Sequence, residues 1–248
     1  MADRTNPLGQ PIGAPVPGWT PRPAPPRTAM AGRYCIVEPL DAARHAKDLF
    51  AANARDFSGR NPTYLSTEAY ASFDDYLRWM EAVTHVDDPL FHAVVDAASG
   101  TAAGVASFMR IDRPNGVIEI GHINFSPLLQ RTTASTEAIF LMLRRAFDEL
   151  GYRRCEWKCD SLNAPSRAAA ERFGFRFEGI FRQAVVYKGR NRDTAWYSIV
   201  DTEWPALRDA FERWLSPANF EGGGQKRRLQ EMRRTAPPGQ TRPSTEPG

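Results

Sequence analysis

The sequence predicts an α+β fold in which helices cover both faces of a single β-sheet. Strand-like segments of alternating polar and apolar residues are interleaved with helix-like segments, whose apolar residues recur every three or four positions. With 248 residues and 42% hydrophobic content, the chain has enough apolar material for one substantial core. Three expected strands follow one another with only short turns between them, which is typical of antiparallel pairing.

The helices and strands are placed by this periodicity together with capping and turn residues. The expected elements are, in chain order, a strand at 33–38, a helix capped by Asp41, a helix beginning at Ser72 or Asp74, strands at 91–96, 102–111 and 117–125, a helix from about 135 to 150, a strand at 153–160, a helix capped by Asn163, strands at 175–187 and 194–201, and a helix at 203–215.

The stretch from Val117 to Gly151 reads as a strand, a loop and an amphipathic helix. Regular alternation along the strand places Glu119 and His122 on opposite faces of the sheet. The loop at 130–135 leads into a helix whose first N–H groups lack intrahelical partners and lie at the positive end of the helix dipole. Such a junction suits a bound phosphate. Serine and threonine before a helix are, however, more often ordinary caps.

Composition divides the chain into three parts. We expect a proline-rich extended arm at 1–32, a folded domain at 33–216, and a basic, glycine- and proline-rich flexible tail at 217–248 that folding does not require, with a short helix around 226–234. The arm is expected to lie partly against the domain through Ile12, Val16 and Trp19.

The basic character of the chain comes from its ends. Residues 1–33 and 221–248 each carry a net charge of +3, whereas residues 34–220 carry −3. Nucleic-acid binding usually needs a basic folded face, so this distribution argues against a nucleic-acid partner. No apolar run is long enough for a membrane span, and no secretory signal precedes the domain.

The three cysteines form neither a disulfide framework nor a metal-binding pattern, and we expect no metal. Together with the missing signal segment, this favours a cytoplasmic protein. A Gly-x-Ser-x-Gly elbow or an ordered Ser/His/Asp triad is also absent from the sequence.

Two motifs in order resemble one known family. They are QRTTASTEA at 130–138, and Asn163-Ala164-Pro165-Ser166 followed by ERFGF at 171–175. Together they resemble the GNAT superfamily of acyl-CoA-dependent N-acyltransferases, and especially the branch that includes ribosomal-protein N-terminal acetyltransferases. Asn163 and Gly174 keep the family's spacing of eleven residues, and GRNRD at 189–193 resembles the hairpin of that branch. The resemblance covers roughly residues 33–216.

The resemblance implies a mixed, mostly antiparallel sheet that splays open in a V between two parallel strands, those beginning at Val117 and Arg153. The pantetheine arm of acetyl-CoA, the expected co-substrate, would lie in this V. The residues that the resemblance places at the cofactor are Ile123, Phe125, Gln130, Arg131, Thr132, Thr133, Ala134, Ser135, Thr136, Asn163 and Ser166.

The sequence departs from the family at two positions. Thr133 stands where the phosphate loop usually has glycine, so its β-carbon restricts the backbone there. Ala170 stands where many members have a tyrosine that protonates the leaving thiolate. Ser166 resembles the serine of the ribosomal-protein branch and is the candidate replacement, with an ordinary role in the first helical turn as the alternative.

Glu119 and His122 are the candidates for the base that takes a proton from the attacking amine. Glu119 resembles the strand glutamate of many family members and is preferred. His122 has an ordinary pKa closer to neutrality, and its alternative is a packed, hydrogen-bonded histidine.

In the family, the first two helices and their connection form much of the acceptor pocket. The expected substrate-binding residues are Arg60, Asn61, Tyr64 and Trp79. For Tyr64 and Trp79, simple packing in the core is an equal alternative.

The resulting hypothesis is an N-acetyltransferase that transfers the acetyl group of acetyl-CoA to a primary amine. The amine belongs to a small molecule or a peptidyl N-terminus and attacks directly in a ternary complex. Two alternatives stay open: a non-catalytic acyl-CoA-binding domain, and a ribosome- or nucleic-acid-associated module. The sequence identifies neither the acceptor nor the oligomeric state, for which a homodimer is one candidate.

Overall fold

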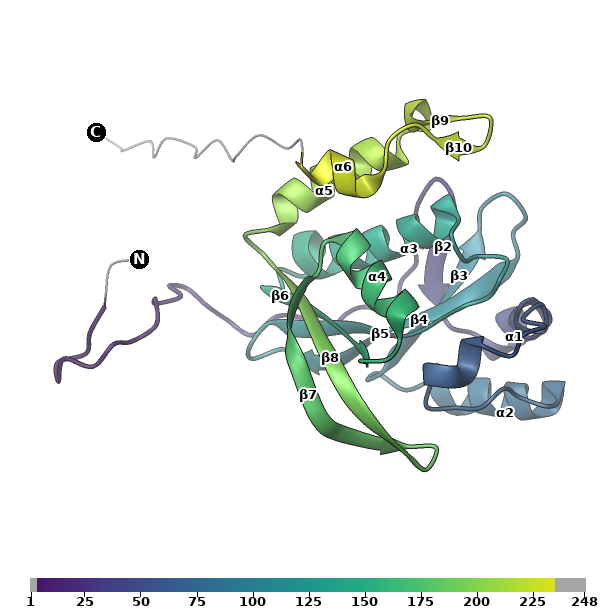
Figure 1. Cartoon of the computed structure of the whole chain (residues 1–248), viewed down its shortest axis with the longest axis horizontal. Coiled ribbons are helices and arrows are strands. Elements are labelled where there is room, and N and C mark those ends of the chain that lie inside the picture. Colours follow the sequence, from purple (N-terminus) through teal and green to yellow (C-terminus); the bar gives the residue numbers. More distant parts are fainter. Residues whose placement is uncertain (1–3, 235–248) are drawn as a thin grey trace.

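A computed structural model describes residues 4–234 and contains one eight-stranded sheet with helices on both faces (Figure 1). The strand order is β1-β2-β3-β4-β5-β6-β8-β7, and within the described residues only β5 and β6 pair in parallel. The expected mixed, mostly antiparallel α+β fold is therefore confirmed. The elements are β1 (Met30–Ala31), β2 (Cys35–Pro39), α1 (Ala42–Asn53), η1 (Asn61–Tyr64), α2 (Phe73–Thr84), β3 (Leu90–Asp96), β4 (Ala102–Asp112), β5 (Val117–Phe125), α3 (Thr133–Arg144), η2 (Arg145–Glu149), β6 (Arg154–Asp160), α4 (Ala164–Phe173), β7 (Arg176–Tyr187), β8 (Arg190–Val200), α5 (Trp204–Leu215), η3 (Pro217–Asn219), β9 (Phe220–Glu221), β10 (Gly224–Gln225) and α6 (Leu229–Arg234).

The two faces of the sheet bury different clusters. Helices α3, α4, α5 and α6 contribute to a large apolar core on one face, whereas α1 and α2 cover β3 and β4 on the other (Figure 1). Strand alternation separates the two clusters, as Ile118 and Ile120 of β5 belong to the large core. Within 4–234, no helix is long and apolar enough to cross a membrane.

The helices begin where the capping residues predict. The side chain of Asp41 accepts from the backbone N–H of Arg44, and that of Ser72 accepts from Asp75. Helix α4 ends at Gly174, whose φ of 104° lies in the left-handed region that favours glycine. The expected starts at Asp41 and Ser72 are therefore confirmed.

Strands β5 and β6 pair only at their beginnings. Their register runs from Val117 opposite Arg154 to Glu119 opposite Glu156, and there the pairing ends. Strand β6 stays paired with β8 along its whole length, so β5 is the strand that diverges. Glu119 therefore stands at the vertex of the predicted V-shaped opening.

A β-bulge in β5 corrects the expected direction of His122. The register jumps from Ser107–Gly121 to Val105–Asn124, and His122 has a φ of 47°. The ring of His122 lies 5.2 Å from that of Phe91, which belongs to the cluster under α1 and α2. His122 therefore shares a face with Glu119, and the prediction of opposite faces is wrong because the extra residue breaks the alternation.

The bulge also reverses the side chain of Ile123, which the regular pattern places beside Glu119. In the structure Ile123 packs against the large core. Asn124 points the other way and donates to the side chain of Asn53 in α1, at 3.4 Å. The face of β5 that is expected to border the acceptor thus carries Glu119, His122 and Asn124.

The N-terminal arm is docked on the domain from Trp19 onward, whereas the residues before it extend away (Figure 1). The indole of Trp19 donates to the carbonyl of Pro114, at 2.8 Å, and Arg22 lies over the Trp19 ring. Strand β1 pairs with β2, so the last residues of the expected arm belong to the sheet. Ile12 and Val16 are 53% and 47% exposed, so of the three expected anchors only Trp19 makes the contact.

The C-terminal segment differs from the expected flexible tail through residue 234. Leu229 and Met232 of α6 are 0% and 5% exposed and belong to the large core. Arg233 donates to the carbonyls of Glu171 and Arg172 at the end of α4, at 2.7 and 3.1 Å. Because Leu229 and Met232 are three residues apart, a helix places both side chains on the face that packs against the core. The rest of the expected tail, 235–248, lies outside the described residues.

We predict that Leu229→Ala lowers the free energy of unfolding by about 2–5 kcal/mol, because it leaves a cavity in the core beneath α6. Urea unfolding followed by circular dichroism measures the change. Leu162→Ala is the matched control, since Leu162 is 77% exposed and its loss should cost less than about 0.5 kcal/mol. Equal stability of the two variants would contradict the docking of α6.

Candidate functional site

The turn before α3 is built as an anion site would require. Arg131 has a φ of 61°, and Thr132 caps the helix by accepting from the N–H of Ser135, at 3.1 Å. The N–H groups of Thr133 and Ala134 lie in the first turn, where no intrahelical acceptor exists. The N-terminus of α3 therefore presents backbone donors, the helix dipole and the exposed side chain of Arg131 in one place.

Two hydroxyl groups near this turn form hydrogen bonds within the protein. Ser135 and Thr136 are 7% and 2% exposed, and both donate their hydroxyl to the carbonyl of Thr132. Their hydroxyls thus bond to the turn itself, and the placement of Ser135 and Thr136 at the cofactor stays a prediction. The left-handed residue is Arg131, whereas Thr133 starts the helix, so the missing glycine does not strain the loop.

The expected cofactor loop and the expected acceptor loop meet at the end of β5. The side-chain amide of Gln130 donates to Asn61 Oδ1 and to the carbonyl of Phe125, both at 2.8 Å. Asn61 also donates to the Phe125 carbonyl, at 3.2 Å. These bonds place η1 beside the end of the diverging strand.

The rest of η1 spans the open side of the V. Tyr64 donates its hydroxyl to the carbonyl of Leu162 in the loop after β6, at 3.1 Å. From the β7–β8 hairpin, Lys188 donates to the carbonyl of Pro62 and Arg190 to that of Thr63. The structure thus joins the β5 end, the loop before α4 and the hairpin through one short helix.

The remaining expected acceptor residues differ in their surroundings. Arg60 is exposed at the start of η1. Trp79 packs its ring 5.7 Å from that of Phe91, whose other neighbour is His122. Trp79 therefore supports the wall behind His122, which agrees with the packing alternative.

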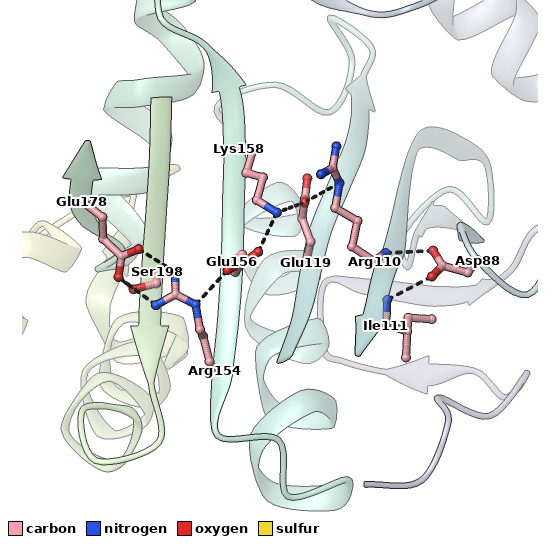
Figure 2. A network of polar contacts seen from close by, with 9 residues as sticks. All are labelled: Asp88, Arg110, Ile111, Glu119, Arg154, Glu156, Lys158, Glu178 and Ser198. Atoms are coloured by element: carbon pink, nitrogen blue, oxygen red, sulfur yellow. Dashed lines mark hydrogen bonds and ion pairs between the residues drawn. The ribbon is translucent and has the colours of Figure 1, made fainter. Parts of the chain in front are cut away.

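Glu119 belongs to a chain of alternating charges that crosses the sheet (Figure 2). Its Oε2 lies 3.0 Å from Lys158 Nζ and 3.3 Å from Arg110 Nε. Lys158 also contacts Glu156, at 2.6 Å, and Glu156 contacts Arg154, at 2.8 Å. Glu119, Glu156 and the side chain of Lys158 are all less than a tenth exposed, so the vertex of the V is both buried and charged.

Burial is the main influence on both candidate bases. It raises the pKa of Glu119 above its usual value, and the positive charges of Lys158 and Arg110 oppose that rise. Burial lowers the pKa of His122, and the charges of Arg110 and Arg192 lower it further. At neutral pH His122 is therefore uncharged, while Lys158 favours the ionised form of Glu119.

At the start of α4, Asn163 accepts from the N–H of Ser166, at 3.1 Å, and so caps the helix. The indole of Trp157 donates to Ser166 Oγ, at 2.9 Å, and the Ser166 hydroxyl also lies within hydrogen-bonding reach of the Cys159 thiol. Trp157 packs in the large core, on the face opposite Glu119. Ser166 and Glu119 therefore approach the V from its two sides.

Sequence reasoning missed Lys158 and Arg110 as members of the site. The alternation of β6 already places Glu156 and Lys158 on one face. A lysine in a strand that is otherwise buried was the available signal, because such a group must be paired. Among residues 4–234, no cluster of histidine, cysteine or acidic side chains has the arrangement of a metal site.

A family model described as an acetyltransferase (GNAT) domain matches residues 35–176, which is more than half of the chain. The chain belongs to the GNAT family. It also resembles a GCN5-related N-acetyltransferase from Brucella melitensis, with 53% sequence identity and a TM-score of 0.87 over 88% of this chain and all of that one. These matches confirm the family resemblance of the two sequence motifs and support an acetyltransferase.

The GNAT branch is also indicated by a relative from Bacillus subtilis, named "Putative ribosomal N-acetyltransferase YdaF". The two chains are 27% identical over 173 residues, which cover 68% of this chain and 91% of the relative. The likeness therefore extends beyond the phosphate loop and confirms the predicted branch of the GNAT family.

One departure from the GNAT pattern has a packing reason. Ala170 is 0% exposed in α4 and belongs to the large core. We predict that Ala170→Tyr destabilises the fold by about 1–3 kcal/mol through overpacking, measured by urea unfolding. The control is Ala168→Tyr, on the exposed side of the same helix. An equally small effect of both substitutions would show that the core beneath α4 has room for the ring.

Proposed function

We propose that this GNAT protein transfers the acetyl group of acetyl-CoA to a primary amine of a small molecule or peptidyl N-terminus, by direct attack within a ternary complex. The observation that carries the proposal is the divergence of β5 from β6 at Glu119, close to the ionised groups of the vertex. Beyond Glu119 the edge of β5 that faces β6 has no partner strand, so its amides suit the pantetheine arm.

The residues present fit such a co-substrate. The first N–H groups of α3 and Arg131 would hold the pyrophosphate, because the helix dipole and the guanidinium both favour negative charge. Ile123 and Phe125 would border the pantetheine through their backbone, and Asn163 and Ser166 would lie beside the sulfur. When bound, acetyl-CoA supplies the activated acyl group.

Glu119 would take the proton of the attacking amine. As the nitrogen bonds to the thioester carbon, the carbon–sulfur bond breaks and the amine proton passes to the carboxylate, directly or through water. Lys158 favours the ionised form that this step needs. Ser166 would donate a hydrogen bond to the thiolate, whose pKa near 8.5 makes full protonation at neutral pH unnecessary.

The placement of acetyl-CoA is tested by Arg131→Glu. We expect its dissociation constant to rise about tenfold or more, since a charge-assisted contact is replaced by repulsion. Isothermal titration calorimetry measures this. Lys47→Glu, an equal charge change on exposed α1, is the control and should bind like the wild type. If Arg131→Glu binds acetyl-CoA as tightly as the wild type, the placement of the cofactor phosphates at this turn is wrong.

The role of Glu119 is tested by Glu119→Gln, which should lower turnover by roughly 10²-fold or more. In the wild type, the rate should rise with pH as Glu119 ionises, and this acidic limb should lie above the ordinary value of 4.5 because burial raises the pKa. Ser166→Ala should cost less, on the order of tenfold. The measurement is a pH–rate profile with one confirmed amine.

Glu178→Gln is the control for this test, because it removes a carboxylate from the same charge chain but on β7. It should retain the acidic limb. If Glu119→Gln keeps both rate and limb while His122→Ala loses both, His122 is the base. Binding of acetyl-CoA without CoA release over a broad amine panel would favour the non-catalytic alternative.

A further inference from the structure

Three polar groups that lie in a row on β8 have no hydrogen-bond partner within the described chain. They are Arg192 Nε, the hydroxyl of Thr194 and the indole N–H of Trp196, all buried and without a hydrogen-bond partner among residues 4–234. The alternation of β8 places them on one face. Thr194 is only 5% exposed. Buried polar groups are normally bonded, so a row of three indicates a binding surface.

The row faces the proposed acceptor side of the sheet. In the register of β6 and β8, Trp196 stands opposite Lys158 and Thr194 opposite Asp160. Lys158 Nζ lies 3.9 Å from the centre of the Trp196 ring and 3.0 Å from Glu119 Oε2. A single ammonium group therefore separates the near end of the row from the proposed base.

The guanidinium of Arg192 has no ion-pair partner at contact distance among residues 4–234. Of the carboxylates near the row, Glu119 and Glu156 pair with Lys158, and Asp160, opposite Thr194, accepts from the hydroxyl of Tyr187, at 2.8 Å. Arg192 forms no ion pair within the described chain, although its charge reaches His122 across the V. All three members of the row can donate hydrogen bonds. A ligand for them must accept several bonds and carry negative charge.

We propose, on the basis of the proposed acetyl transfer, that Arg192, Thr194 and Trp196 bind a carboxylate or phosphate of the acceptor. The acceptor is then a primary amine that carries an oxyanion several bonds away. Residues two apart on a strand are about 7 Å apart, so Thr194 and Arg192 lie about 7 and 13 Å from Trp196 along β8. Such a spacing suits an anionic side chain or tail rather than a group next to the amine.

The test compares matched amines that differ only in charge. One pair is 12-aminododecanoate and 12-aminododecanamide, whose extended chains are long enough to reach from Glu119 past Lys158 to the row; the other is the peptide Ala-Ala-Ala-Glu-Ala-amide and its counterpart with glutamine in place of glutamate. For the wild type, we expect kcat/KM to be at least tenfold higher for the charged member of one pair or both. The pair that shows the preference distinguishes a small acceptor from a peptidyl one.

Arg192→Gln should reduce this preference to about threefold or less, by raising KM for the charged amine and not for the neutral one. Thr194→Val should reduce it partly, and Arg192→Lys should keep part of it. The control is Arg182→Gln, an exposed arginine on the neighbouring strand, which should leave the preference intact. Unchanged acetyl-CoA affinity verifies the fold of each variant.

Turnover of the neutral amines without a preference for the charged ones would overturn this proposal and leave acetyl transfer standing. A preference that survives Arg192→Gln would also overturn it. Absence of CoA release with these amines and with a broad amine panel would overturn the proposed function as well.

Discussion

The candidate site depends on the ion pairs that the buried ammonium group of Lys158 makes with two carboxylates. Its side chain is 5% exposed and lies between the carboxylates of Glu119 and Glu156, where β5 and β6 stop pairing. Burying one such ion costs several kcal/mol, so it needs both carboxylates. The attraction joins the two strands at the vertex, where backbone bonds end. The contact between Lys158 and Glu119 also favours the ionised form of the Glu119 carboxylate, which is buried.

The charge chain continues to the surface on both sides. Arg110 is 58% exposed beyond Glu119, and Glu178 is 41% exposed beyond Arg154. Each buried ion thus has a neighbour of opposite sign (Figure 2), and the two end residues are exposed to solvent. Removing one inner member would leave an unpaired buried charge, which is more costly than losing an exposed pair. Substitutions at Glu119 therefore test chemistry and local structure together.

A second buried carboxylate fixes the direction of α3. Glu137 accepts from the backbone N–H groups of Arg33, Tyr34 and Cys35, at 2.9, 2.5 and 2.8 Å. A β-carbon at Gly32 would lie 2.3 Å from this carboxylate, so any larger residue there would displace the carboxylate from its three hydrogen bonds. The start of the sheet is thereby tied to the helix whose N-terminus forms the proposed phosphate-binding turn. The packed α6 and the docked arm complete the covering of that core.

The sequence by itself determined the order of the main elements, the caps at Asp41, Ser72 and Asn163, and the GNAT family, because these depend on neighbouring residues and local spacing. Only the tertiary structure decided which groups meet in the V. The bulge at His122 depends on the register between two strands, and no local signal marks it. The partners of Lys158 lie on different strands, so their pairing follows from sheet order.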